Sequence, residues 1–462
     1  MTGYDVVVIG GGISGLSAAY WLRRRGLQVL VVEAASRVGG AMRSVAAEGF
    51  ILDCGPNTVA SNDPALWQEF GELGIEGERI SADRRAGRRF ILLNGRPELL
   101  LVSLGALLRS PLLSPAAKLR LLAEPFIPRT AAADESVASF VARRLGPEPA
   151  ERLLDPFISG TYAGDPRALS MRATFPALWG AERRAGSLLA GLLTAPRTAG
   201  SRRARGERRP RSVLFSFRGG IERWPQAYAH VLGPEQLWTD APATALRPSF
   251  SGWQVDVRRD GATLTVDANA VILATPAYVS AELLQGLDAQ AASALRGIPY
   301  ASLAVVHLGY ARGQVAHPLD GFGLLCPAAE RRQILGILWP SSLFPDRAPD
   351  EAILTATFIG GARMPQQTAL GDEELVALAR AEHEALLGAS GPPRLARVTR
   401  WPRAIPQYLA GHQARQRELE RLEANWPGLH LLGSYRDGIS VEKCWRRGVE
   451  LGQTLEPGRR EG

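Results

Sequence analysis

The chain begins with two short apolar runs separated by a glycine-rich segment and an apolar-faced helical pattern. Residues 4–9 read Tyr-Asp-Val-Val-Val-Ile and residues 28–32 read Gln-Val-Leu-Val-Val, so both runs are rich in β-branched residues. Residues 16–22 have the spacing of a helix, and Gly26 marks its end. Continuous apolar runs on either side of a helix are typical of buried parallel strands. The pattern predicts a β-α-β unit that ends near residue 33.

The turn between the first strand and the helix has the spacing G-x-G-x-x-G. Gly10 allows a tight turn, Gly12 lets the backbone approach a pyrophosphate, and Gly15 lets the helix pack closely on the strand. Ile13 and Ser14 open the helix, whose free N–H groups face such phosphates. Because the strand, helix and second strand all fall in register, we interpret the segment as a dinucleotide-binding site.

The residues after the second strand specify the type of dinucleotide. Glu33 is placed to accept both ribose hydroxyls, which disfavours a 2′-phosphorylated cofactor. Residues 34–44 (AASRVGGAMRS) resemble the E-A-x-x-R-x-G-G-x-x-R-S extension of flavoproteins in the amine oxidase and protoporphyrinogen oxidase group. The resemblance implies that Gly39, Gly40 and Arg43 lie along the pyrophosphate of FAD, with the guanidinium of Arg43 as a fixed positive fork.

Later segments return to the same apolar strand pattern. Residues 253–257 and 263–266 alternate as a hairpin, and residues 270–276 (AVILATP) predict a buried strand that leads into a turn. Residues 428–433 predict another strand, followed by a helical pattern over 441–451. The cofactor domain is therefore expected to be built from separated segments of the chain.

Two other regions lie between these segments. Residues 99–195 are rich in Leu, Ala and Arg with helical spacing. Residues 298–398 combine strand patterns at 304–308 and 353–358 with an amphipathic helix over 372–387. The first region predicts a helical lobe and the second predicts a mixed sheet.

The helical region contains one strongly apolar stretch, over residues 99–108 and 111–113. It can be an internal core of that lobe, or a surface that dips into one leaflet of a membrane beside the surrounding arginines. Residues 197–211 carry seven arginines among Gly, Ser and Pro, which indicates a solvated, flexible segment. No aromatic residues are interleaved there, so the segment does not favour nucleic-acid binding.

Composition limits the class of protein. A chain of 462 residues with 46% hydrophobic and 22% charged residues is typical of a globular protein of two or three lobes. No apolar run reaches the length of a bilayer span, and no signal-peptide pattern precedes the first strand. Three widely spaced cysteines indicate a reducing, cytoplasmic location and no metal site.

Three further stretches resemble the protoporphyrinogen oxidase family over nearly the whole chain. The first is DPFISGTYAGDP at residues 155–166, followed by LSM at 169–171. The second runs from GFGLLCP at 321–327 through SSLFPDRAP at 341–349 to FIGGA at 358–362. The third is WPRAIPQY at 401–408, ending in Gly411 and His412. Other amine oxidases and carotenoid desaturases share the FAD motif without this combination.

The resemblance implies which residues bind substrate. Arg89, which precedes the F-x-L-x-N-G pattern, would hold a propionate of the substrate, as a guanidinium fork binds a carboxylate well. Leu325, Leu338 and Phe358 would sandwich a tetrapyrrole, and Gly160 of the first stretch is included in the site. The chemistry needs no acid–base residue of the protein, since the flavin carries it.

The resemblance also implies further contacts to FAD. These are Gly55, Pro56, Asn57 and Thr58 beside the flavin ring, Trp401 near it, Ile439, Ser440 and Val441 over the ribityl chain and ring, and Ala243 at the adenine. The C-terminal loop departs from the family pattern because it ends in Glu442 and Lys443. An acidic residue near the flavin would disfavour the anionic reduced form.

The expected fold is α/β, a two-domain flavoprotein with a discontinuous Rossmann-like FAD-binding domain, a mixed-sheet substrate domain and a helical lobe. The first domain is assigned to residues 1–85, 212–297 and 399–462, and the second to residues 86–98 and 298–398. The helical lobe, with membrane association as its second interpretation, takes residues 99–211.

The expected function is oxidation of protoporphyrinogen IX to protoporphyrin IX, in three hydride transfers to FAD, with O₂ reduced to hydrogen peroxide. The alternatives are oxidation of coproporphyrinogen III to coproporphyrin III, amine oxidation, or a flavin- and porphyrin-binding protein without turnover. Amine oxidation is disfavoured because the only lysines, Lys118 and Lys443, are poorly placed for it. Expected partners are the tetrapyrrole and O₂, with the inner face of the plasma membrane and a homodimer left open, and no nucleic acid.

Overall fold

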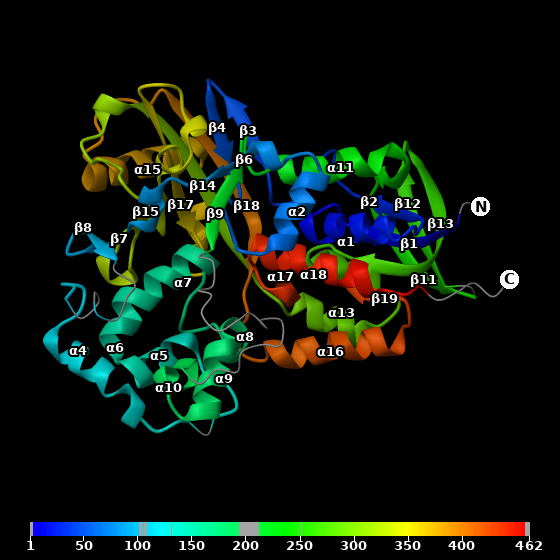
Figure 1. Ribbon diagram of the computed structural model, residues 1–462, viewed down its shortest axis with the longest axis horizontal. Coiled ribbons are helices and arrows are strands. Elements are labelled where there is room, and N and C mark those ends of the chain that lie inside the picture. Colours follow the sequence, from blue (N-terminus) through cyan, green and yellow to red (C-terminus); the bar gives the residue numbers. More distant parts are fainter. Residues whose placement is uncertain are drawn as a thin grey trace.

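The computed structural model describes residues 3–100, 105, 109–130, 132–193, 212–250 and 252–457. These residues form two seven-stranded sheets, two small sheets and a group of helices below the second large sheet in Figure 1. Within this part of the chain, every helix is too short or too polar to cross a bilayer. The segments 101–104, 106–108 and 194–211 lie outside the described residues, and so does most of the apolar and arginine-rich sequence noted above.

The first large sheet is made from three separated segments of the chain. Its strands are β1 (Gly3–Ile9), β2 (Val29–Val32), β10 (Leu237–Trp238), β11 (Ala243–Ser249), β12 (Gly252–Arg259), β13 (Ala262–Leu273) and β19 (Leu429–Leu431). The order is β10-β2-β1-β13-β12-β11, and β19 also pairs with β13. β1 is parallel to both β2 and β13, as the buried apolar runs predicted.

One expectation about this sheet was wrong. The segments 263–266 and 270–273 were expected to be separate strands, but both belong to β13. The first part of β13 pairs antiparallel with β12, and its second part pairs parallel with β1. The chain needs no turn between them because Asp267 and Ala268 belong to both ladders. The pattern changes from alternating to continuously apolar where the strand passes from the edge hairpin into the centre of the sheet.

Helices cover both faces of the first sheet. On one face pack α1 (Ile13–Arg24), α2 (Pro64–Glu72), α11 (Arg223–Gln236) and α18 (Val441–Thr454). On the other pack α12 (Ala277–Leu284), α13 (Ala289–Arg296) and α16 (His412–Asn425). Val6 and Val8 of β1 point to the first group and Val7 to the second, and all three are fully buried.

The second large sheet has the order β18-β14-β17-β16-β15-β7-β8. Its strands are β7 (Arg89–Leu93), β8 (Arg96–Leu100), β14 (Tyr300–Ala311), β15 (Gly323–Leu325), β16 (Gly336–Leu338), β17 (Ala352–Gly360) and β18 (Leu395–Pro406). One face is covered by α15 (Asp372–Leu387), whose bounds agree with the sequence prediction. This helix buries Leu375, Ala379 and Leu386 against the sheet.

Two small sheets stand beside the large ones. β3 (Ser44–Ala47) pairs with β4 (Phe50–Asp53), and β9 (Val213–Phe217) lies between β5 (Val59–Ser61) and β6 (Arg79–Ser81). We propose the domain division given above, with one refinement. Residues 399–406 belong to β18 of the second sheet, so the third segment of the FAD-binding domain would begin after Pro406.

The helical lobe lies below the second sheet in Figure 1. Its helices are α4 (Pro115–Leu122), η3 (Glu124–Phe126), α5 (Val137–Leu145), α6 (Pro147–Pro149), the π-helix η4 (Ala150–Leu154), α7 (Asp155–Tyr162), α8 (Met171–Thr174), α9 (Pro176–Ala185) and α10 (Leu188–Leu193). Arg144 is fully buried in this lobe and pairs with Glu124 and Glu182. Leu112 and Leu113, at the end of the apolar stretch that the structure describes, are buried and so belong to the core of this lobe.

Candidate active site

The glycine-rich turn between β1 and α1 has the close packing that its spacing predicted. A Cβ on Gly10 would lie 2.7 Å from the Ala274 carbonyl oxygen, and one on Gly15 would lie 2.1 Å from the Gly10 carbonyl oxygen. Gly12 differs, because no protein atom lies within 4 Å of the position of its Cβ. The space beside the start of α1, which opens with Ile13 and Ser14, is therefore free for a ligand at the helix N-terminus.

Glu33 lies at the end of β2 and closes the other side of this turn. Its Oε2 accepts the N–H of Gly11 at 2.7 Å, and its Oε1 accepts the N–H of Ala35 at 2.8 Å. Each carboxylate oxygen keeps a second acceptor position for a ribose hydroxyl. The segment that contains Ala243 lies beside Glu33, since the N–H of Ala241 donates to the Glu33 carbonyl at 2.8 Å. The residue predicted for the ribose thus lies next to the segment that leads into Ala243, the residue predicted for the adenine.

The second glycine pair lies against the first turn. The N–H of Gly39 donates to the Gly11 carbonyl at 2.8 Å, and a Cβ on Gly40 would lie 3.7 Å from the Cα of Gly12. Both glycines have positive φ, 99° and 56°, which other residues rarely adopt. Arg43 is exposed and forms no ion pair among the described residues, so its charge is free for an anion.

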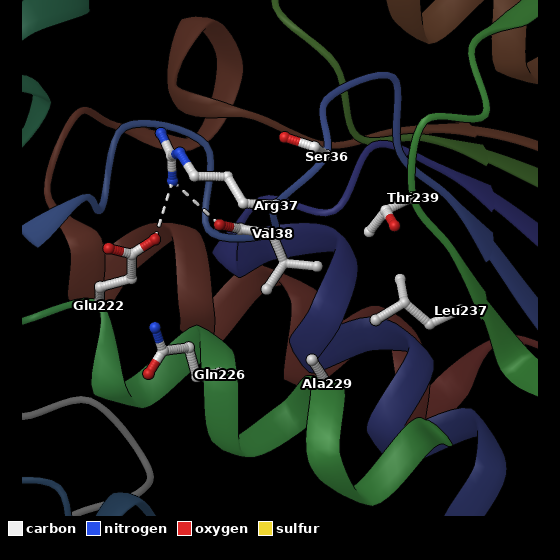
Figure 2. A pocket seen from close by; sticks show the side chains of 8 residues that line it. All are labelled: Ser36, Arg37, Val38, Glu222, Gln226, Ala229, Leu237 and Thr239. Carbon is white, nitrogen blue, oxygen red and sulfur yellow. Dashed lines mark hydrogen bonds and ion pairs between the residues drawn. The ribbon is translucent and has the colours of Figure 1, made fainter. Parts of the chain in front are cut away.

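Arg37 holds this glycine pair in place, a role that the sequence reasoning missed. Its Nη1 donates to the Val38 carbonyl at 3.0 Å and pairs with Oε1 of Glu222 at 3.2 Å (Figure 2). Its Nη2 donates to the Gly40 carbonyl at 2.7 Å. The spacing E-x-x-x-R-x-G-G was the available signal, but it does not reveal the partner Glu222, which precedes α11. A pocket of about 230 Å³ opens beside Arg37, and none of the predicted cofactor residues lines it.

The loop before β5 connects the cofactor residues with the second sheet. A Cβ on Gly55 would lie 2.2 Å from the Ala41 carbonyl oxygen, which places Gly55, Pro56, Asn57 and Thr58 next to the second glycine pair. The indole Nε1 of Trp401 donates to the Cys54 carbonyl at 2.8 Å. Trp401 and Gly55 to Thr58 are half-buried. The structure thus brings the two predicted groups of flavin contacts together.

The predicted contacts at the C-terminal end lie at the start of α18. Ser440 caps this helix by accepting the N–H of Lys443 at 3.3 Å, with Ile439 before it and Val441 after it. α18 packs closely along α1, and a Cβ on Gly448 would lie 2.3 Å from the Ser14 carbonyl oxygen. Since Ser14 meets Gly448 and Ala18 meets Gly452, the two helices run in the same direction and begin at the same end.

Glu442, the departure noted in the sequence, does not carry an isolated charge. It forms an ion pair with Arg446 one turn later in α18, and Arg446 also reaches Oδ2 of Asp63 at 2.9 Å. The positive guanidinium offsets the negative field that Glu442 would otherwise present near the start of the helix.

The substrate residues predicted from separate motifs lie on one face of the second sheet. Leu325 pairs with Ile91 and Gly336, and Gly336 pairs with Phe358. Leu338 pairs with Gly323, two residues before Leu325. Because directly paired residues share a face and alternate residues repeat it, Leu325, Leu338 and Phe358 face the same side.

The same reasoning extends the face to both ends of the sheet. Arg89 lies two residues before Ile91 on β7, and therefore on the side of Leu325. On β14, Val305 pairs with both Phe358 and Thr399, and Leu303 pairs with Trp401. One face thus carries Arg89 at one end, three apolar side chains in the middle and Trp401 at the end nearest the flavin contacts. We call this the substrate face; the opposite side is the one covered by α15.

Gly160 of α7 lies opposite the substrate face. A Cβ on this residue would be 2.4 Å from Cδ2 of Leu325, so any larger side chain would displace Leu325. Leu325, Leu338, Phe358 and Trp401 are each only partly buried, although they lie among buried neighbours of the sheet. Partly exposed apolar side chains that share one face are available to a flat apolar ligand.

Arg89 differs from the arginines around it. Arg88 is paired with Asp320 and Arg85 with Asp83, whereas Arg89 forms no ion pair among the described residues. Its guanidinium lies 5.1 Å from the ring centroid of Phe322. Desolvation by the surrounding protein lowers its pKa, because no carboxylate compensates for it. A cation of this kind at the end of an apolar face is suited to bind a carboxylate ligand.

Among the described residues, this face carries no catalytic lysine, metal-binding cluster or charged histidine. Lys118 lies on α4 and Lys443 on α18, so neither belongs to a strand of the second sheet. No group of three or more His, Cys, Asp or Glu side chains in the described ranges is arranged to hold a metal ion. Burial lowers the pKa of His412 to about 4, so this histidine is neutral and serves the packing against Tyr408.

Among the residues that the structure describes, those at the glycine turns leave open space, N–H groups at the start of α1 and an arginine without an ion pair, as a dinucleotide requires. Comparison with known proteins agrees with this fit. Residues 13–451 match the family described as flavin containing amine oxidoreductase. This match confirms the prediction of FAD as cofactor.

Curated relatives align with almost the whole chain. Protoporphyrinogen oxidase 2 of Arabidopsis thaliana is 32% identical, over 97% of this chain and 93% of the relative. The protoporphyrinogen oxidase of Homo sapiens is 35% identical, over 96% of this chain and 97% of the relative. Coproporphyrinogen III oxidase of Bacillus subtilis is 27% identical, over 96% of each chain.

Solved structures show the same architecture. A candidate protoporphyrinogen oxidase from Exiguobacterium sp. 255-15 superimposes with a TM-score of 0.80 and 22% identity, over 98% of this chain and 99% of that one. Reduced UDP-galactopyranose mutase follows with a TM-score of 0.73 and 17% identity, over 98% and 93%. These matches confirm the predicted α/β flavoprotein fold. The chain therefore belongs to the flavin-containing amine oxidoreductases, and among them to the protoporphyrinogen oxidase group.

Proposed function

We propose that this protein oxidises protoporphyrinogen IX to protoporphyrin IX. The reaction removes six electrons in three steps, each of which takes a hydride from a meso carbon and releases a proton. The net loss is four hydrogens from the meso carbons and two from pyrrole nitrogens, because tautomerisation moves a hydrogen from the fourth meso carbon to nitrogen. Three molecules of O₂ are reduced to three of hydrogen peroxide. The observation that carries the proposal is the substrate face, where one unpaired arginine and three apolar side chains lie in line with Trp401.

The residues of the chain bind and orient rather than react. FAD, when bound along the glycine turns and the start of α18, supplies the hydride acceptor. Arg89 would hold one propionate and so fix which edge of the macrocycle lies toward Trp401. Leu325, Leu338 and Phe358 would contact its faces and exclude water. Gly160, which has no side chain, lets α7 pack directly on Leu325 and so hold that side chain on the substrate face.

The curated relatives favour the substrate with two carboxylates. The protoporphyrinogen oxidases are 32% and 35% identical to this chain, whereas the coproporphyrinogen III oxidase is 27% identical. Coproporphyrinogen III, the alternative, carries four carboxylates and would need additional cations. Among the described residues, Arg89 has no ion pair, and neither has Arg96, whose pairing with Leu93 places it on the same side of the sheet. The higher identity to the protoporphyrinogen oxidases supports the protoporphyrinogen assignment over the alternative.

The test compares the two substrates on the purified flavoprotein without oxygen. Bleaching of the flavin is followed after mixing with protoporphyrinogen IX or coproporphyrinogen III, and porphyrin fluorescence is followed after air is admitted. Faster bleaching by protoporphyrinogen IX supports the proposal. Faster bleaching by coproporphyrinogen III would assign that compound as the substrate. If neither compound bleaches the flavin, the protein is either an amine oxidase or a flavin- and porphyrin-binding protein without turnover.

We further propose that the helical lobe contacts a membrane surface. Leu119, Leu122 and Phe126 are 69%, 51% and 86% exposed, and their spacing puts them on one side of α4 and η3. Lys118 and Arg129 lie beside them in the sequence. Exposed apolar side chains with neighbouring cations are suited to the interface of an anionic bilayer, where a lipophilic substrate would dissolve.

A further inference from the structure

Helix α7, which carries Gly160, is attached at both ends to the turn that follows β17. At its first residue, Asp155 accepts hydrogen bonds from Nη1 of Arg363 at 2.9 and 3.0 Å on its two oxygens. Beyond its last turn, the Ala163 carbonyl accepts the N–H of Ala362 at 2.7 Å. The turn that provides both donors comes directly after the strand that carries Phe358.

Asp155 is also connected to the strand that carries Leu325. Its Oδ2 accepts the N–H of Ala328 at 2.8 Å, and Ala328 begins the short 3-10 helix η6 (Ala328–Glu330) after β15. One carboxylate therefore joins the elements that bear Gly160, Leu325 and Phe358. The side chains of Asp155 and Arg363 are 12% and 16% exposed, so solvent screens the pair only in part.

The local conformation of this segment does not itself fix where α7 lies. The five residues before Asp155 form a π-helix, which is rare and interrupts the regular helix. Ala163, which ends α7, has a left-handed conformation with φ of 47°, unfavourable for a residue with a Cβ. Both departures require further contacts to hold them, and the Asp155–Arg363 pair is a charged contact that ties this segment to the second sheet.

We propose that Asp155 and Arg363 are positioning residues for substrate. Their ion pair sets how closely α7 packs on the substrate face, and thereby the position of Leu325, against which Gly160 packs, relative to Leu338 and Phe358. This inference rests on the proposed function. Neither residue contacts the flavin residues or the substrate carboxylate anchor, so their effect would pass through the placement of α7.

The kinetic test uses the full flavoprotein with Asp155→Asn, Arg363→Gln and the double variant. Each single variant is expected to raise the KM for protoporphyrinogen IX about tenfold, with FAD content and flavin absorption unchanged, because a charge-assisted contact is lost. The KM of the double variant should be no higher than that of the more strongly affected single variant, because all three variants lose the same ion pair. Arg332→Gln is the matched control: it removes an ion pair of 3.4 Å with Glu382 of α15, on the opposite side of the sheet.

Hydrogen exchange of residues 155–163 separates this inference from the proposed function. Exchange should become faster there in Asp155→Asn and stay unchanged in Arg332→Gln. If the wild type oxidises porphyrinogens but Asp155→Asn keeps the wild-type KM, the positioning role is wrong and the function stands. If the wild type oxidises neither porphyrinogen, the proposed function is wrong. The inference that the pair positions substrate is then wrong as well, even if hydrogen exchange changes as expected. If the fold increases in KM of the two single variants multiply in the double variant, the inference is wrong as well.

Discussion

Trp401 and Cys54 connect the substrate face with the predicted flavin contacts. The indole Nε1 of Trp401, on β18, donates a hydrogen bond of 2.8 Å to the carbonyl of Cys54, and Gly55 follows directly. The end of the second sheet and the loop before β5 are therefore held together at the point where cofactor and substrate would meet. A shift of either element would alter both sites.

Replacing Trp401 by Phe should weaken FAD binding. The ring is kept but the hydrogen bond is lost, and a net hydrogen bond contributes about 1 kcal/mol, so the Kd of FAD should rise about fivefold. Titration of the apoprotein with FAD, followed by flavin fluorescence, measures this. Trp253→Phe is the control, because it also loses a bond from Nε1 to a backbone carbonyl, that of Pro427 at 3.2 Å, far from the glycine turns. Equal Kd values for both variants would contradict the coupling.

Replacing Arg89 by Ala should raise the KM for protoporphyrinogen IX by about ten- to a hundredfold, since a charge-assisted carboxylate contact is worth about 1.5–3 kcal/mol. FAD content should not change, because Arg89 lies at the other end of the substrate face from Trp401. Steady-state kinetics provide the measurement. Arg88→Ala is the matched control, as Arg88 is occupied by Asp320. Unchanged kinetics in Arg89→Ala would remove this residue from the site.

Adding one methyl group at Gly160 should hinder substrate while leaving the flavin in place. The new Cβ would lie 2.4 Å from Leu325, which has to move into the space over the substrate face. Overpacking of this size costs about 1–3 kcal/mol, so Gly160→Ala should raise KM roughly tenfold. Gly286→Ala, where no protein atom lies within 4 Å of the added Cβ, should behave as wild type. A wild-type KM in Gly160→Ala would place the macrocycle elsewhere.

The protein should lose stability as the pH falls below about 6.5, in part through buried histidines. Burial lowers the pKa of His383 to about 3 and that of His307 to about 4. The unfolded chain binds protons at higher pH than the native state, so the stabilisation is complete above pH 6.5 and is lost as pH falls toward 4. His383→Gln should therefore make this acid-side slope shallower by up to about 1.4 kcal/mol per pH unit, measured by denaturant unfolding.

The control for this effect is His230→Gln, because His230 is exposed. It should leave the dependence of the free energy of unfolding on pH unchanged. The same slope in His383→Gln and wild type would show that the native state accommodates the charged imidazole.

Phe126→Glu should weaken binding to vesicles of anionic lipid. The substitution puts a negative charge at a side chain that is 86% exposed next to Leu122 and Leu119. Flotation of the protein with vesicles in a density gradient measures the bound fraction, which should fall severalfold because both apolar burial and charge attraction are reduced. Phe250→Glu is the control, since Phe250 is fully exposed at the β11–β12 turn, away from the helical lobe. Equal loss in both variants would count against a specific surface.

The local parts of the fold could be predicted because their information is local. The run from β1 to Glu33 follows from apolar period, glycine spacing and one acidic residue, and α15 follows from its periodicity alone. Pairing between distant strands could not be predicted in the same way. β13 was divided in two because its halves have different patterns, and β1, the partner of its second half, is more than 250 residues away in the sequence.

The sequence by itself determined the cofactor turn, the likeness to the protoporphyrinogen oxidases and the identity of the candidate residues, since residue type and spacing encode these directly. Only the tertiary structure decided that Arg89, Leu325, Leu338, Phe358 and Trp401 share one face, because that depends on strand register. It alone showed that Arg89 has no ion pair within the described part of the chain, beside the Arg88–Asp320 pair, and that Asp155 pairs with Arg363, 208 positions away. Charge pairing across such distances is set by packing, which no local pattern records.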